Sequence, residues 1–96
     1  MKKSQLDDAG ENALLTTGNQ IKAARALAGM GQKSLADAAS VGINTIRNFE
    51  ASGKEAVQGR IGTREAIRNA LFKAGVELLD DGQPSTSGLG VRLRKE

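Results

Sequence analysis

The chain has 96 residues, of which 39% are hydrophobic and 26% are charged, and two phenylalanines are its only aromatic residues. This length predicts one domain, with a core of Ala, Leu, Ile and Val in closely packed helices. Cysteine and histidine are absent. Their absence excludes disulfides, thiol nucleophiles, Cys/His zinc sites and imidazole acid–base catalysis. No nucleophile stands beside a base either, so we expect no enzyme activity, no metal and no cofactor.

The charge is mildly basic and unevenly spread. Fourteen Lys and Arg against eleven Asp and Glu give a net charge of +3, but residues 18–74 hold nine basic and four acidic residues, a charge of +5. A basic body of this kind favours a nucleic-acid partner. There is no run of about 18 apolar residues and no apolar stretch after the first three residues. We therefore expect a cytoplasmic protein without a membrane span or signal peptide.

The first 16 residues are polar and predict a mobile N-terminal arm. Thr17 and Gln20 have the spacing of a capping box, in which each side chain bonds the backbone N–H of the other residue. This motif predicts the start of a first helix over residues 18–28. Apolar residues recur along one side of that helix, and Gly29 is suited to end it.

Two short helices are predicted next, over residues 32–39 and 43–51. Only residues 40–42 separate them. Two short helices joined by three residues cannot lie antiparallel and must cross steeply, which is the geometry of a helix-turn-helix. In this arrangement Val41 is expected to be the buried residue of the turn.

The remaining sequence predicts a loop, a helix and two strands. Residues 52–62 are rich in Gly and charge, which indicates an exposed loop. Thr63 is expected to cap a fourth helix, and Gly75 stands where a helix ends. Strands are predicted over residues 76–79 and 90–94. A lone hairpin is only marginally stable in water, so these strands must pack against the helices or pair with another chain.

The segment over residues 32–50 resembles the Cro-type, or xenobiotic-response-element (XRE), helix-turn-helix of bacterial and phage repressors. It reads Gln-x-x-Leu-Ala-x-x-Ala-x-Val-x-x-x-Thr-Ile-x-x-x-Glu, and the resemblance extends over residues 18–75. It implies a mainly α, four- to five-helix lambda repressor-like fold with a short C-terminal β-hairpin or strand. Residues 17–75 would form the DNA-binding domain, and residues 76–96 the C-terminal strands and tail, a candidate dimerisation element.

The resemblance implies that the third helix is the recognition helix and enters the major groove. The residues for which we predict base contacts are Ile43, Asn44, Thr45, Arg47 and Asn48. Asn can bridge adenine and Arg can bridge guanine, each good pair contributing about 1–3 kcal/mol of discrimination. For Arg47, a phosphate contact or a solvated side chain is the alternative to base reading. For Asn48, the solvated side chain is the favoured alternative. Ile43 can equally contact a thymine methyl or pack against the domain.

Phosphate contacts are expected on both sides of the groove. The N-terminus of the second helix offers free N–H groups and a positive dipole end to a phosphate. The residues for which we predict phosphate contacts are Gln32, Lys33, Ser52, Lys54, Arg60, Thr63 and Arg64. A solvated side chain is the alternative for Gln32. Family members also form an ion pair at positions that match Arg25 and Glu50, so the resemblance implies a structural role for these two residues.

The sequence departs from the family pattern at two helix caps and one turn. Gly31 and Gly42 stand where Ser or Thr usually caps the second and third helices, at a cost of a few tenths of a kcal/mol each. Ser40 occupies a turn position where Gly is usual. We therefore expect Ser40 to adopt a positive φ with some backbone strain.

The function that the resemblance implies is sequence-specific transcriptional regulation. The protein would be a bacterial or phage-encoded repressor or autoregulator that binds a palindromic double-stranded DNA operator as a homodimer. The short sequence after the fourth helix leaves no room for a ligand-sensing domain, so no small-molecule ligand is expected. The alternative is a protein-binding helix-turn-helix, such as an antitoxin or antiactivator, with a partner protein. The third helix favours a DNA partner over a protein partner, because it carries polar residues and Arg47 and has no acidic residue before Glu50.

Overall fold

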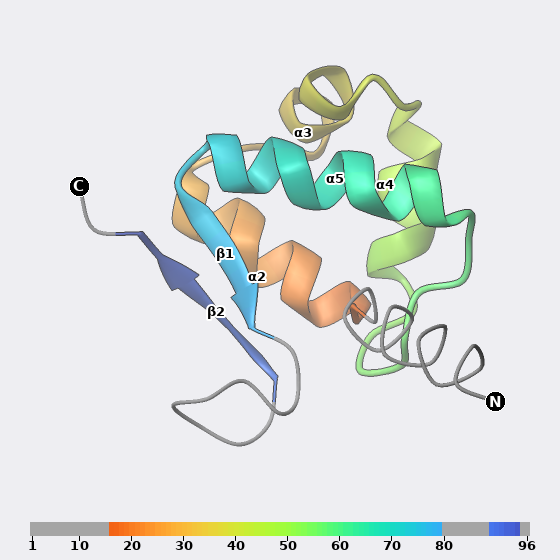
Figure 1. The fold of residues 1–96 in the computed structure, drawn as a ribbon. Helices are drawn as coiled ribbons and strands as arrows, with labels where there is room; N and C mark the ends of the chain where they lie inside the picture. The colour runs from red at the N-terminus through yellow and green to blue at the C-terminus, as the bar shows by residue number, and fades with distance from the viewer. Residues whose placement is uncertain (1–15, 80–88, 95–96) are drawn as a thin grey trace, which may run out of the picture.

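The computed structural model describes residues 16–79 and 89–94. These residues form a mainly helical fold with one two-stranded antiparallel sheet (Figure 1). Its elements are α2 (Gly18–Ala28), α3 (Gln32–Ala39), α4 (Ile43–Glu50), α5 (Ile61–Lys73), β1 (Val76–Leu79) and β2 (Gly90–Leu93). Except for Thr16, the predicted N-terminal arm lies outside the described residues. Of the helices described, none has the length and apolar character needed to cross a membrane.

The capping box predicted at the start of α2 is confirmed. The Thr17 hydroxyl accepts from the Gln20 N–H at 3.1 Å, and the Gln20 side-chain oxygen accepts from the Thr17 N–H at 2.9 Å. The Gln20 side-chain amide also donates to the backbone oxygens of Leu79 and Gly90, at 2.9 and 3.1 Å. One side chain therefore both begins α2 and ties the hairpin to it. At the other end, Gly29 closes the helix with a φ of 70°.

Replacing Thr17 by Ala should lower the free energy of unfolding by about 1 kcal/mol, because it leaves a helix N–H without its cap. Thr17→Ser, which keeps the hydroxyl, is the matched control and should lose much less. Urea unfolding followed by circular dichroism measures both. Equal losses from the two variants would mean that the methyl group, rather than the cap, provides the stability.

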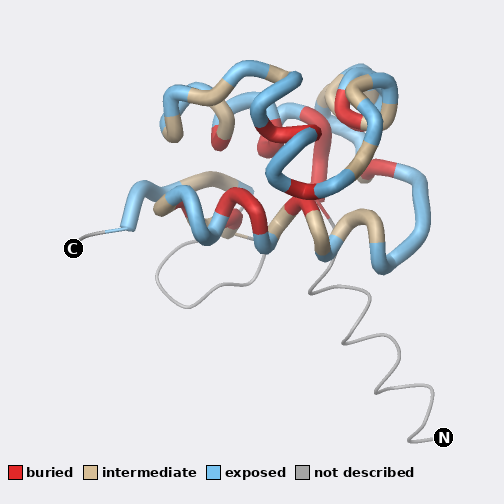
Figure 2. Tube along the Cα trace, turned by 90° about the horizontal axis from the view of Figure 1, so that it is seen from above, coloured by how far each residue is buried: buried red, intermediate tan, exposed pale blue. Residues whose placement is uncertain are grey.

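The core lies where the inner sides of the four described helices meet β1. Its largest fully buried side chains come from all five elements: Ile21, Leu35, Ile46, Ile67, Leu71 and Val76. Figure 2 shows the buried stretches facing the middle of the molecule and the exposed ones on the outer turns. Because each helix contributes to one cluster, the position of α4 is fixed by packing on α2 and α3.

The turn between α3 and α4 has the expected backbone. Ser40 adopts a φ of 59°, and the Val41 N–H donates to the Ala36 oxygen at 2.9 Å. Val41 is half-buried against the core, so it is less deeply buried than predicted. The helix α4 ends at Glu50, one residue before its predicted end.

The prediction of an exposed loop over residues 52–62 is wrong at Val57, which is buried. Its N–H donates to the Thr16 oxygen at 2.8 Å, and the neighbouring Ala56 forms a β-bridge with Thr17. The loop is therefore held against the residues that precede α2. The adjacent apolar residues Ala56 and Val57, in an otherwise mostly polar segment, were the only sequence signal for this contact.

The prediction that Thr63 caps the fourth helix is also wrong. α5 begins at Ile61 with Arg60 at the N-cap position, and the Arg64 N–H donates to the Arg60 oxygen at 3.1 Å. No side chain caps this end. The helix therefore starts two residues before Thr63, without the side-chain cap that the sequence offered.

Candidate nucleic-acid interface

The helix α4 has one buried side and one exposed polar side. Ile46 is fully buried and Phe49 is 6% exposed, so both anchor the helix to the core. Asn44, Arg47 and Asn48 are exposed. Burial of an apolar side chain of this size contributes about 1.5–3 kcal/mol, which holds the helix firmly enough to present its polar side in a fixed orientation.

Three of the five predicted base-contacting residues thus lie on the exposed side of α4. Arg47 donates to the Asn44 side-chain oxygen at 3.3 Å. Both side chains reach solvent, so they can exchange this weak contact for a base edge. Thr45 is half-buried. Ile43 is also half-buried and packs against the core, which is one of the two roles left open for it.

The ion pair expected between α2 and the end of α4 is present. Arg25 donates to both carboxylate oxygens of Glu50, at 2.6 and 3.0 Å, and Gln32 donates to the same carboxylate at 3.1 Å. The Glu50 side chain is 6% exposed and that of Arg25 is 17% exposed. This network joins three helices and turns the only carboxylate of α4 inward.

The electrostatics of Glu50 follow from this network. Burial acts to raise the pKa of the Glu50 carboxyl, but the hydrogen bonds from Arg25 and Gln32 and the nearby positive charges outweigh it and hold the pKa below its usual 4.5. The hydrogen bond with Glu50 also raises the pKa of Arg25. Glu50 is therefore ionised and neutralised by its partner at neutral pH, and it adds little negative potential to the exposed side of α4.

The N-terminus of α3 lies at the other side of the helix-turn-helix. Gly31 provides no side-chain cap, so the first N–H groups of α3 are not satisfied by a capping side chain. The side-chain amide of Gln32 points to Glu50, which gives this residue a structural contact in addition to the phosphate contact predicted for it. Lys33 pairs with Asp37 at 3.2 Å, and both side chains are exposed.

The loop after α4 holds the next predicted phosphate-contacting residues. The Ser52 hydroxyl accepts from the Gly18 N–H at 3.1 Å and lies 2.8 Å from the Phe49 oxygen, to which it donates. A phosphate contact by this hydroxyl would have to replace an internal hydrogen bond. Lys54 is exposed. Gly18 is required at this junction, because a Cβ there would lie only 2.6 Å from the Glu50 backbone oxygen.

The first turn of α5 completes the set of predicted phosphate contacts. Arg60 is exposed, whereas Thr63 and Arg64 are half-buried. The first turn contains no acidic residue. The Nε of Arg64 is buried without a hydrogen-bond partner in the part of the chain that the structure describes. An anion at this helix end would therefore meet uncapped N–H groups beside the exposed Arg60.

Sequence reasoning missed two structural roles close to this surface. Gln32 links α3 to α4 through Glu50, and Ser52 fastens the loop to the start of α2. Neither role has a local sequence signal, because each contact joins residues 18 or more positions apart.

No protein-family model matches this sequence, and no match is found among curated proteins. Within residues 16–79 and 89–94, no group of acidic residues is arranged to hold a metal ion. The site is thus defined by its own geometry: an anchored helix with a polar exposed side, followed by basic side chains at the start of another helix.

Proposed function

We propose that this protein is a sequence-specific DNA-binding transcriptional regulator that binds a palindromic double-stranded operator as a homodimer. The exposed side of α4 supports this function. The helix α4 exposes Asn44, Arg47 and Asn48, while its only carboxylate is turned inward and paired with Arg25. Asn and Arg are the side chains best able to form two hydrogen bonds with a purine in the major groove.

The residues around α4 supply groups that suit the DNA backbone. The uncapped N-terminus of α3 precedes α4, and Arg60 and Arg64 stand at the uncapped start of α5. Phosphate contacts from such groups set the register of a protein on the duplex but do not read its sequence. The proposal therefore assigns base reading to α4 and positioning to α3, the loop and α5.

Selection from a pool of random duplexes tests the proposed function. The full-length protein should enrich one sequence with two-fold symmetry, with half-sites about one helical turn apart, because each copy of a dimer reads one half. A matched selection with the Arg47→Ala variant controls for enrichment that does not depend on α4. Retention of duplexes without any preferred sequence would contradict the proposal and favour a protein-binding helix-turn-helix.

A further inference from the structure

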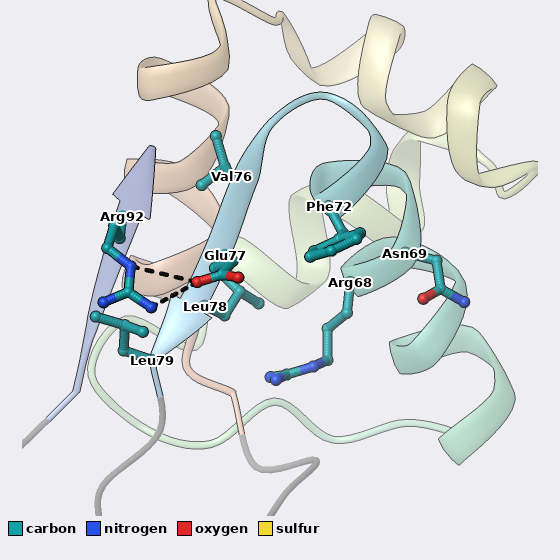
Figure 3. Close-up of a pocket in the computed structure, with 8 residues that line it drawn as sticks. All are labelled: Arg68, Asn69, Phe72, Val76, Glu77, Leu78, Leu79 and Arg92. Atoms are coloured by element: carbon teal, nitrogen blue, oxygen red, sulfur yellow. Dashed lines mark hydrogen bonds and ion pairs between the residues drawn. The ribbon is translucent and has the colours of Figure 1, made fainter. Parts of the chain in front are cut away.

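A cleft of about 410 Å³ lies along the outer edge of β1, between that strand and α5 (Figure 3). We call it the β1–α5 cleft. It is lined by Arg68, Asn69 and Phe72 of α5, by residues 76–79 of β1 and by Arg92 of β2. Its volume is within the range of ligand-binding clefts. Because α4 and β1 lie on opposite sides of the molecule (Figure 1), the cleft is separate from the candidate nucleic-acid interface.

The main chain of β1 directs polar groups into this cleft. Within the described residues, the only strand that pairs with β1 is β2. The Arg94 N–H donates to the Gly75 oxygen at 2.6 Å, and hydrogen-bonded pairs alternate along an antiparallel ladder. Val76 and Leu78 lie between such pairs, so their N–H and C=O groups point away from β2. β1 therefore presents two donors and two acceptors along the cleft.

Two side chains of α5 line the cleft one helical turn apart. Phe72 is 46% exposed, and the Arg94 guanidinium lies 4.1 Å from the centre of its ring. Figure 3 shows Phe72 beside the middle of β1 and Arg68 reaching toward the end of the strand at Leu79. Arg68 is half-buried and donates to the Thr16 hydroxyl at 2.7 Å. Because a guanidinium has five N–H donors, Arg68 can hold Thr16 and a carboxylate together.

The charge around the cleft is positive. Among the described residues that line it, Glu77 is the only acidic one, and it pairs with Arg92 at 2.7 Å. Arg68 in the lining and Arg94 over the Phe72 ring add two further positive charges. Three arginines and one glutamate give a net charge of +2. Complementary charge therefore favours an acidic ligand.

We infer that the β1–α5 cleft binds an extended acidic segment of a partner protein, which adds to the sheet as a third strand beside β1. The main chain of the segment pairs with Val76 and Leu78. Arg68 and Phe72 are about 6 Å apart along the axis of α5, and alternate residues of a strand are about 7 Å apart. One acidic and one apolar side chain, two residues apart on the segment, therefore reach Arg68 and Phe72 together.

The order of these two side chains follows from the direction of the strands. α5 and β1 are joined by two residues and run in opposite directions, which places Arg68 nearer the end of β1 than Phe72 (Figure 3). A segment antiparallel to β1, the more stable pairing, meets Arg68 first. We therefore expect the order acidic-x-apolar. The residue between them lies beside Glu77 on the other face of the sheet, where a second acid would be destabilising.

A peptide fits this cleft better than a nucleic acid. A phosphate backbone has no N–H group for the carbonyl oxygens of Val76 and Leu78, whereas a peptide main chain supplies both donors and acceptors. DNA held by α4 would also leave the cleft open, because α4 is on the other side of the molecule (Figure 1). The inference thus adds a second surface to the protein and does not depend on the proposed function.

Fluorescence anisotropy with labelled seven-residue peptides tests the inference on the full-length protein. The probe carries glutamate at its third position, leucine at its fifth and threonine elsewhere. A matched peptide with lysine in place of glutamate should bind about tenfold more weakly or worse, because it loses the charge-assisted hydrogen bonds with Arg68. Arg68→Glu should reverse this preference. Lys73→Ala removes an exposed positive charge of α5 outside the cleft and should preserve it.

Methylated peptides test the strand pairing. The N–H groups of the glutamate and of the leucine face β1, so methylation of either nitrogen should weaken binding by about 5- to 150-fold. The N–H of the threonine between them faces away from β1. Methylation of that nitrogen is the matched control and should have little effect.

Four results would overturn the inference. Equal affinity for the glutamate and lysine peptides, or no binding, would exclude an acidic segment, and equal losses from all three methylations would exclude pairing with β1. A fall in the mass by light scattering when the probe is added would identify a second copy as the occupant. Binding of the probe only to a Glu11→Lys variant would identify the chain's own N-terminal segment, in which Glu11 and Ala13 have the same spacing.

The selection of duplexes by the unmodified protein keeps the two proposals apart. A preferred symmetric duplex without binding of the glutamate peptide would contradict only the inferred partner site. Binding of the glutamate peptide without a preferred duplex would contradict only the proposed function.

Discussion

Glu50→Ala is expected to lower the free energy of unfolding by about 3–5 kcal/mol, the largest effect of any single change considered for this protein. The substitution leaves the guanidinium of Arg25, which is only 17% exposed, without the carboxylate that it contacts at 2.6 Å. An unpaired buried charge costs this much because its lost hydration is no longer compensated. Gln32 loses the same partner. Urea unfolding followed by circular dichroism measures the loss.

Two further variants show whether the pair itself is responsible. Glu50→Gln keeps a hydrogen-bond acceptor for Arg25 and should lose less stability than Glu50→Ala, so it stays measurable if the alanine variant does not fold. The double variant Arg25→Met/Glu50→Leu removes both charges and should be more stable than Glu50→Ala alone. A loss of less than 1 kcal/mol for Glu50→Ala, the usual size for an exposed pair, would contradict a structural role for the network.

The pH dependence of stability follows from the same carboxylate. Because the pKa of Glu50 in the folded protein is below its ordinary value of 4.5, the folded state binds this proton less readily than the unfolded state. The stabilisation is thus complete above about pH 4.5 and is lost as the pH falls through the lower pKa of the folded state. The difference in stability between the unmodified protein and Glu50→Gln should accordingly shrink on acidification below pH 4.5.

Local sequence signals predicted most of the helical elements. The Thr17 and Gln20 capping box, the glycine at position 29 and the turn at Ser40 each act through residues a few positions apart, and each is found as expected. Such motifs carry their own hydrogen bonds, so they specify structure before any tertiary contact forms. The bounds of α2 and α3 agree with the prediction for this reason.

The errors arise where distant contacts decide the structure. Val57 joins the buried core and its N–H bonds the Thr16 oxygen, a contact between residues far apart in the sequence, and α5 begins two residues ahead of Thr63. In the candidate site, the helical period of α4 was sufficient to separate the polar residues from Ile46 and Phe49. The inward contact of Gln32 and the internal hydrogen bonds of Ser52 depend on where α2 and α4 meet, which no local pattern encodes.

Arg47→Ala is expected to reduce the preference of the protein for its selected operator by about 1–3 kcal/mol, or roughly 5- to 150-fold. Arg47 is exposed in the middle of α4, held beside Asn44 by a weak contact that a guanine edge can replace. Binding to random duplexes depends on phosphate contacts and should change much less. Affinity for operator therefore falls more than affinity for random DNA.

Two variants that remove the same charge elsewhere are the controls. Arg64→Ala, at the start of α5, should weaken binding to both duplexes equally and reduce the slope of log affinity against log salt by about one. Lys73→Ala, exposed at the other end of α5, should change neither affinity by more than a small electrostatic amount.

Whether α4 reads base sequence is decided by one titration. Fluorescence anisotropy at a fixed salt concentration gives the affinity of the unmodified protein and of Arg47→Ala for the selected operator and for a scrambled duplex. We expect the ratio of operator to scrambled affinity to fall by roughly 5- to 150-fold in the variant. The same loss of affinity for both duplexes, with the ratio unchanged, would contradict sequence reading by α4.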